Sequence, residues 1–188
     1  MKQAALKAFI YNAAFCLATT ASAAQGGGLC EREMVRAAQR FDVPLAILYA
    51  VGMTESGSGG ALEPYALNIE GVSIFPASIG EALGRFKAAR QSGTKLIDVG
   101  CMQINHYFHG ARFESVDVMF DPRRNVEYAA MFLRQLREKE GSWTLAAARY
   151  HAGPGNNPAQ KKYVCRVISN MVRGGFGAWT RDATEFCA

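Results

Sequence analysis

The segment from residue 121 to 172 carries the strongest local signals in the chain, and they predict consecutive helices. Asp121 stands before Pro122, the order found where an N-cap residue precedes proline at the first helical position. Gly141 ends this helix, and Ser142 caps the next one. The helices are expected over residues 121–141, 142–150 and 158–172, and the buried stripe of the first is Val126, Ala129, Ala130, Leu133 and Leu136.

The first half of the chain predicts shorter elements. Asp42 followed by Pro44 predicts a helix start, and apolar residues recur at helical spacing as far as Met53. Three glycines within residues 56–60 end that helix. Helices are also expected over 31–40 and 79–91, a hairpin over 65–75 and a short strand over 95–99. The balance predicts a predominantly helical α+β fold with a small β-hairpin or insert.

Size and charge limit the classes of function. The chain has 188 residues, enough for one domain with its own core, and its 49% hydrophobic content is that of a globular protein. The formal net charge of +5 is not gathered into a dense Lys/Arg run, so no nucleic-acid partner is expected. The mild positive charge suits contact with an anionic cell wall, or serves solubility alone.

The N-terminal residues are typical of a secretory signal. Two lysines precede a mostly apolar stretch over residues 8–19, and Ala21-Ser22-Ala23 offers a cleavage site. The apolar stretch is shorter than the roughly 20 residues that span a membrane. We therefore expect a signal peptide over residues 1–24, a single domain over 25–188, and no membrane attachment once the signal is removed.

Four cysteines follow the signal: Cys30, Cys101, Cys165 and Cys187. An even number in an exported chain favours two disulfides over thiol or metal chemistry. Of the three possible pairings, Cys30–Cys101 with Cys165–Cys187 is preferred, because the second closes a local loop. The chain has no CxxC spacing and only three histidines, so neither a metal site nor another cofactor is expected.

Glu55 lies at the end of the predicted apolar helix, on the same face as Leu48, Val51 and Gly52. Apolar surroundings disfavour the charged carboxylate and raise its pKa, and the negative end of the helix dipole acts in the same direction. A carboxyl group that stays protonated near neutral pH can donate a proton to a glycosidic oxygen. From the helix alone, a solvated residue at a helix end is the more frequent alternative.

Further polar residues follow along the chain. Gln103 and Asn105 alternate after the predicted strand, so an extended chain would present both amides to one side, where they could bind sugar hydroxyls. A turn whose amides bond to the backbone is the alternative. Tyr150 and His151 end a helix before a tight turn, and Tyr163 lies in the last helix, where a tyrosine is more often part of the core.

Four short motifs occur in a specific order. Glu55-Ser56 is followed by Gly-Cys-Met-Gln-Ile-Asn over 100–105, Ala-Arg-Tyr-His-Ala-Gly-Pro-Gly over 148–155, and Lys-Tyr-Val over 162–164. Together they resemble the soluble lytic transglycosylase (SLT) family, which has a lysozyme-like domain. The resemblance covers about Cys30 to Val172. It looks closest to a branch with an insertion, here about 62–97, between the catalytic Glu and the Gly-Cys-Met-Gln motif.

The resemblance implies a role for each matching residue. Glu55 matches the catalytic acid/base of the family. His151 replaces an asparagine of the family motif, and Tyr163 matches a tyrosine whose hydroxyl lies near the acid. The substrate-binding residues that the resemblance implies are Ser56, Gln103, Asn105, Tyr150, His151 and Tyr163.

The resemblance also implies a mechanism with one carboxylate. Most glycosidases pair two carboxyl groups, but Glu63, Glu70, Asp98 and Asp117 occur in no motif that would fix them beside Glu55. Glu55 is expected to protonate the oxygen between N-acetylmuramic acid and N-acetylglucosamine in peptidoglycan. Help from the substrate's own N-acetyl group then leads to a 1,6-anhydro end.

Two other functions are compatible with the same motifs: a hydrolytic muramidase on this fold and a non-catalytic wall-binding protein. The expected location is the periplasm, and the expected role is local wall opening for a secretion system, pilus or flagellum. Residues 173–188 lie beyond the family core. They are expected to form a strap held by Cys187, with a partner-docking tail as the alternative.

Overall fold

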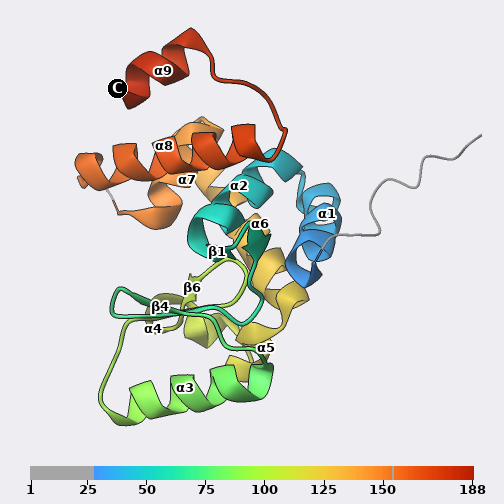
Figure 1. The fold of residues 1–188 in the computed structure, drawn as a ribbon, viewed down its shortest axis with the longest axis vertical. Helices are drawn as coiled ribbons and strands as arrows, with labels where there is room; N and C mark the ends of the chain where they lie inside the picture. Colours follow the sequence, from blue (N-terminus) through green and yellow to red (C-terminus); the bar gives the residue numbers. More distant parts are fainter. Residues whose placement is uncertain (1–27, 154) are drawn as a thin grey trace, which may run out of the picture.

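The computed structural model describes residues 28–153 and 155–188, which form a mainly helical molecule with a small sheet (Figure 1). The predicted helical α+β fold is therefore confirmed. The signal expected over residues 1–24 lies outside the described residues. The described α-helices are α1 (Leu29–Phe41), α2 (Leu45–Glu55), α3 (Ile79–Gln91), α4 (His106–His109), α5 (Val116–Phe120), α6 (Pro122–Glu140), α7 (Trp143–His151), α8 (Asn157–Arg173) and α9 (Arg181–Cys187), with a 3-10 turn, η1, over Gly110–Arg112.

Helix α6 begins and ends where the sequence signals predict. The Asp121 side chain accepts a hydrogen bond from the main-chain N–H of Arg124, at 2.9 Å, and Pro122 occupies the first turn. Gly141 ends the helix with a left-handed φ of 82°. The helix packs against α1 and α7. The fully buried residues of the predicted stripe are Val126, Ala129, Ala130 and Leu133.

Helix α2 lies in the middle of the helical part, packed against α1 and α8 (Figure 1). It is apolar on all sides, as a helix enclosed by its neighbours must be. The predicted start at Asp42 is wrong. Asp42 instead ends α1 in a left-handed conformation, with a φ of 52°, and its N–H bonds to the carbonyl of Ala38. A short polar side chain tolerates that conformation, and α2 begins only after Pro44.

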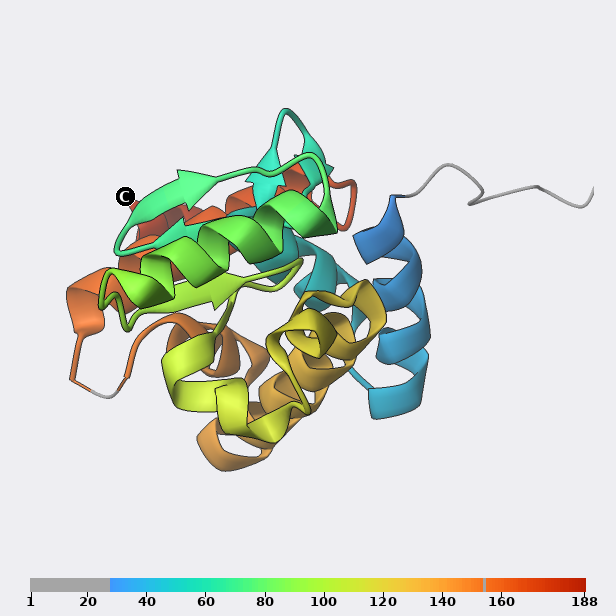
Figure 2. The same cartoon turned by 90° about the horizontal axis from the view of Figure 1, so that it is seen from below.

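The strands form two antiparallel sheets. In the larger one the order is β4-β3-β5-β6, and helix α3 lies along it (Figure 2). The hairpin of β3 and β4 and the strand β5 confirm the predictions over 65–75 and 95–99. Residues 62–97, the expected insertion, thus supply much of this sheet. The strands are β1 (Gly57–Ser58), β2 (Ala61–Leu62), β3 (Leu67–Ile69), β4 (Val72–Ile74), β5 (Ile97–Val99) and β6 (Ile104–Asn105).

One hydrophobic core joins the helices to the sheet, since buried residues of α1, α2 and α6 cluster with those of β3 and β5. One disulfide lies within this core and another lies outside it. Cys30–Cys101 ties the start of α1 to the turn after β5, and Cys165–Cys187 ties α9 to α8. The preferred pairing of the cysteines is therefore confirmed. None of the described helices combines the length and the apolar character that crossing a membrane requires.

Candidate active site

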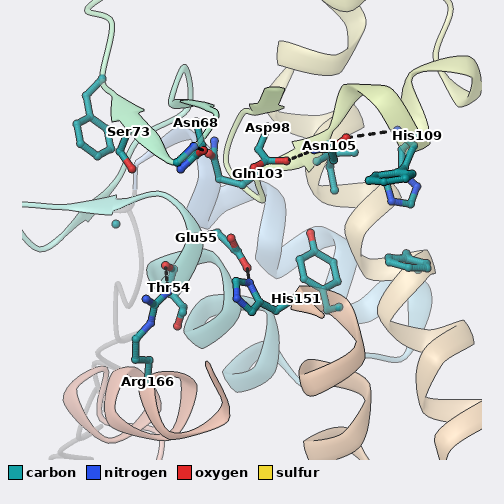
Figure 3. A pocket seen from close by; sticks show the side chains of 17 residues that line it. Thr54, Glu55, Asn68, Ser73, Asp98, Gln103, Asn105, His109, His151 and Arg166 are labelled. Atoms are coloured by element: carbon teal, nitrogen blue, oxygen red, sulfur yellow. Dashed lines mark hydrogen bonds and ion pairs between the residues drawn. The ribbon is translucent and has the colours of Figure 1, made fainter. Parts of the chain in front are cut away.

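A cavity of about 640 Å³ lies between the helices and the larger sheet (Figure 3). This volume is in the usual range for ligand sites. Its lining comes from two sides, which we call the helical wall and the sheet wall. The helical wall consists of Thr54, Glu55, Phe132, Tyr150, His151 and Arg166, and the sheet wall of Asn68, Ser73, Phe75, Asp98, Gln103, Ile104 and Asn105. The remaining lining residues are Gly57, Gly71, Phe108 and His109.

Glu55 is the last residue of α2, and its side chain is only 16% exposed. Burial raises its pKa to about 7. A hydrogen bond from Tyr163 and the positive charge of Arg166 oppose that rise, while the negative charge of Asp98 adds to it. At neutral pH about half of such groups hold a proton, so Glu55 can serve both as a proton donor and as a proton acceptor.

Tyr163 lies directly behind Glu55. It comes from α8, which packs along α2, and its hydroxyl donates a hydrogen bond of 2.7 Å to Oε1 of Glu55. Tyr163 is fully buried, and burial together with the nearby Glu55 carboxylate raises the pKa of its phenol well above 10. The phenol therefore remains a hydrogen-bond donor throughout the neutral range and fixes the orientation of the carboxyl group.

His151, at the end of α7, faces Glu55 across the cavity floor (Figure 3). Its ring stacks on that of Tyr163, with centroids 4.3 Å apart and planes 5° from parallel. Its Nδ1 lies 4.0 Å from Oε1 of Glu55. Burial and the positive charge of Arg166 lower the pKa of His151, so the ring is mostly neutral near pH 7. A neutral imidazole does not hold Glu55 in the charged form.

Gln103 and Asn105 both line the cavity, but the predicted extended arrangement is wrong for Gln103. Its φ of 46° is left-handed, and its Nε2 donates to the carbonyls of Ala66 and Gly100, at 3.0 Å each. Asn105 lies in β6, and its Oδ1 caps helix α4 while its Nδ2 donates to Asp98. Both amides already bond to the protein, as the turn alternative predicts, and both residues line the cavity.

The side chain of Asn125, on α6, holds the turn that carries Gln103 through hydrogen bonds to the main chain. The Asn125 side chain accepts from the N–H of Met102 and donates to the carbonyls of Val99 and Met119, all within 2.9 Å. Gly100 has a φ of 80°, and a Cβ there would lie 2.6 Å from the Asn125 amide. The glycine of the Gly-Cys-Met-Gln motif is therefore required by this close approach.

Tyr150 and Ser56 differ in their access to the cavity. Tyr150 lines it, and its hydroxyl donates to the carbonyl of Met102 at 2.7 Å. Ser56 is 1% exposed and lies outside the lining, and its hydroxyl donates to the carbonyl of Cys101 at 2.7 Å. The predicted contact of Ser56 with substrate therefore stays a prediction, and the structure shows its hydroxyl bonded within the protein. Burial turns its hydroxyl into a link between the end of α2 and the turn that carries Gln103.

Two charged residues of the cavity lining, Asp98 and Arg166, were not among the predicted site residues. Asp98 lies between buried Ile97 and Val99, so strand alternation turns it away from the core, and burial raises its pKa. Arg166 follows Tyr163 by three positions on α8, which places the two side chains on neighbouring parts of one face. Both signals are visible in the sequence once the elements are known. Over residues 28–153 and 155–188, no group of three or more His, Cys, Asp or Glu is arranged to hold a metal ion.

A helical body joined to a small sheet, with a buried protonatable glutamate over a polar cavity, defines a lysozyme-like class of protein. Residues 33–169 match the family described as the transglycosylase SLT domain. This match covers most of the chain, which therefore belongs to that family. Membership implies lytic transglycosylase activity on peptidoglycan. No curated protein and no solved structure shows a significant match to the chain.

Proposed function

We propose that this protein cleaves the β-1,4 bond between N-acetylmuramic acid and N-acetylglucosamine and leaves 1,6-anhydromuramic ends. The observation that carries the proposal is the buried Glu55 carboxyl, with its pKa raised to about 7 and its orientation set by Tyr163. One group that is half protonated at neutral pH can give a proton and take one back within the same turnover.

The reaction begins when Glu55 donates its proton to the glycosidic oxygen. The bond from that oxygen to C1 of the muramic acid breaks, and the N-acetylglucosamine leaves with a free hydroxyl. The carbonyl oxygen of the substrate's own N-acetyl group stabilises the positive charge at C1. The Glu55 carboxylate then removes the proton from the C6 hydroxyl, and O6 closes on C1 without water.

The neighbouring residues act by position. Tyr163 keeps Oε1 of Glu55 in place in both protonation states, at 2.7 Å. Gln103, Asn105, Tyr150 and His151 line the cavity from both walls, where amide, hydroxyl and ring edges suit sugar hydroxyls and N-acetyl groups.

A hydrolytic muramidase is the second candidate, because one more carboxylate faces the cavity. Of the four carboxylates considered from the sequence, Asp98 lies in the cavity lining, on the wall opposite Glu55 (Figure 3). A hydrolase could use such a group to orient water. Asp98 is held by a 2.7 Å hydrogen bond from Asn105, which favours a fixed part of the wall over a free base.

Digestion of purified sacculi followed by mass spectrometry separates these functions. Anhydromuramic ends are the product of the lyase, whereas reducing ends mark the hydrolase. The absence of any soluble fragment would show a wall-binding protein without activity. The lyase proposal fails if reducing ends predominate from the first time points.

Glu55→Gln tests the acid itself and carries the largest expected effect. It removes the proton that is transferred, so kcat/KM should fall by about 10³-fold or more. The control is thermal unfolding at pH 8. Above pH 7 wild-type Glu55 is ionised while buried, which destabilises the fold, so the Gln variant should unfold at the same or a higher temperature. Activity within tenfold of wild type would exclude Glu55 as the acid.

The wider role is proposed from the same function. A signal over residues 1–24 would send a single domain, over 25–188, to the periplasm, where peptidoglycan lies. Local wall opening for a secretion system, pilus or flagellum suits a protein of this size. A deletion strain that loses assembly of such a machine, and regains it with wild-type protein but not with Glu55→Gln, would support this role.

A further inference from the structure

Arg166 lines two hollows at once. It belongs to the helical wall of the cavity at Glu55, and it also borders an adjoining groove of about 570 Å³ along the outer side of α8. Figure 3 places Arg166 at the α8 edge of the cavity, beside Thr54. The two hollows therefore meet at a guanidinium group, and a substrate in the cavity can extend over it into the groove.

The Arg166 guanidinium is only partly used by the protein. One N–H donates to the carbonyl of Thr54 at 3.2 Å, and the group lies 6.0 Å from the Tyr163 ring centroid. Arg166 is exposed, and a guanidinium carries five N–H donors in a planar fork that matches a carboxylate. Among the described lining residues of the cavity, it is the one Lys or Arg.

Further positive side chains line the groove beyond Arg166. Lys162 is one helical turn before Arg166, on the same face of α8, and is exposed. Lys161 also borders the groove, but its ammonium group donates to the main-chain oxygen of Ala188 and lies over the Phe186 ring. These contacts with the C-terminal segment already engage its charge. No Asp or Glu is present among the described residues that line the groove. Arg166 and Lys162 thus form a positive strip leading away from Glu55.

We propose that Arg166 and Lys162 bind the carboxylates of the stem peptides that peptidoglycan carries on its muramic acid residues. The proposal rests on the glycan-cleaving function given above. A stem peptide is attached to the sugar that is cut, and its free carboxylates extend beyond the glycan strand. With muramic acid at Glu55, the stem leaves over the α8 edge, where the two cations favour it. The protein should therefore prefer strands that retain their stems.

The decisive comparison uses two substrates: purified glycan strands with stems, and the same strands after an amidase has removed them. Lys162 is the residue to change, because Arg166 also influences the pKa of Glu55. Lys162→Glu should lower kcat/KM on stem-bearing strands by about fivefold, mainly through KM, and leave kcat/KM on stripped strands unchanged. Lys87→Glu is the matched control, because Lys87 is exposed on α3, at the opposite end of the molecule from α8 (Figure 1). It should change neither value.

Two results would overturn the proposal: equal cleavage of both substrates by the wild-type protein, or equal losses on both in Lys162→Glu. Cleavage of neither substrate by the wild-type protein would instead remove the proposed function itself. A preference for stem-bearing strands that weakens as salt rises from low to physiological concentration would support the charge interaction, because exposed pairs are screened.

Discussion

The two walls of the cavity hold their polar groups in different ways. On the helical wall, the Glu55 carboxyl bonds to the Tyr163 hydroxyl behind it, and the His151 ring stacks on Tyr163. These three side chains come from α2, α7 and α8 and contact one another directly. On the sheet wall, Gln103 and Asn105 bond to main-chain groups and to neighbours within the wall. The helical wall controls a proton, and the sheet wall presents a fixed surface.

The acidity of Glu55 and the shape of the sheet wall are therefore stabilised by different contacts. Burial between helices sets the pKa of Glu55 near 7, and the Tyr163 bond moderates it. The turn of the sheet wall depends on one buried amide, Asn125 of α6, which bonds to main-chain groups and not to the acid. Asp98 is the exception, because it belongs to the sheet wall yet its charge raises the pKa of Glu55. A substitution in one wall should therefore leave the other wall largely unchanged.

Asn125→Ala should weaken the sheet wall most. It removes three hydrogen bonds and leaves the N–H of Met102 and the carbonyls of Val99 and Met119 buried without this partner. We expect the free energy of unfolding to fall by about 3 kcal/mol, measured by urea or thermal unfolding. Amide exchange should show the loss first in the turn over 100–105, ahead of α2.

The control for this change is Asn170→Ala on the helical side. Asn170 is half-buried, and its Nδ2 donates to the Thr54 hydroxyl at 3.0 Å. Loss of this one bond should cost about 1 kcal/mol or less. Equal destabilisation by the two variants would show that Asn125 has no special part in holding the sheet wall.

Tyr163→Phe should alter the helical wall and leave the sheet wall in place. The lost hydroxyl no longer orients Glu55, so kcat/KM should fall by about tenfold at pH 6. The hydrogen bond from Tyr163 favours the charged carboxylate and lowers the pKa of Glu55. Without it that pKa rises above about 7, and the fall of kcat/KM on the basic side should move to higher pH.

Tyr150→Phe is the matched control for Tyr163→Phe. The Tyr150 hydroxyl donates to the carbonyl of Met102, on the turn of the sheet wall, and not to Glu55. Its loss should reduce kcat/KM without moving the basic limb of the pH profile. If both variants move the limb equally, the Tyr163 bond does not set the pKa of Glu55.

The helices were predictable because their signals are local. The Asp121-Pro122 start, the Gly141 end and the apolar stripe of α6 lie within a few residues of the atoms they govern. Glu55 was predictable as a candidate for a similar reason, since the apolar face of its own helix explains its burial. Its role, however, depended on motifs elsewhere in the chain, because a single helix does not reveal what packs across its end.

The sheet wall was harder to predict, because its conformation depends on contacts distant in sequence. Gln103 alternates with Asn105 as a strand would, yet its left-handed φ follows from bonds to Ala66 and Gly100. Asn125 shares a helix face with buried Ala129, which indicates burial but not its partners. Ser56 follows the acid in the first motif, but its position there does not predict the bond from its hydroxyl to the carbonyl of Cys101, 45 residues further along the chain.

Asp98→Asn changes the sheet wall but should affect Glu55 on the helical wall, and its expected effect is the smallest. The negative charge of Asp98 raises the pKa of Glu55, so its removal should lower that pKa and move the basic limb to lower pH, opposite to Tyr163→Phe. The asparagine Oδ1 can still accept the hydrogen bond from Asn105. At pH 7, kcat/KM should fall by about two- to threefold, because less Glu55 is protonated.

Glu70→Gln is the control, because Glu70 is exposed in the turn between β3 and β4 and lies outside the cavity lining. A loss of 100-fold or more in Asp98→Asn, with the pH profile unmoved, would instead make Asp98 a second catalytic carboxylate. The sheet wall would then take part in the chemistry, and the hydrolytic mechanism would replace the lyase.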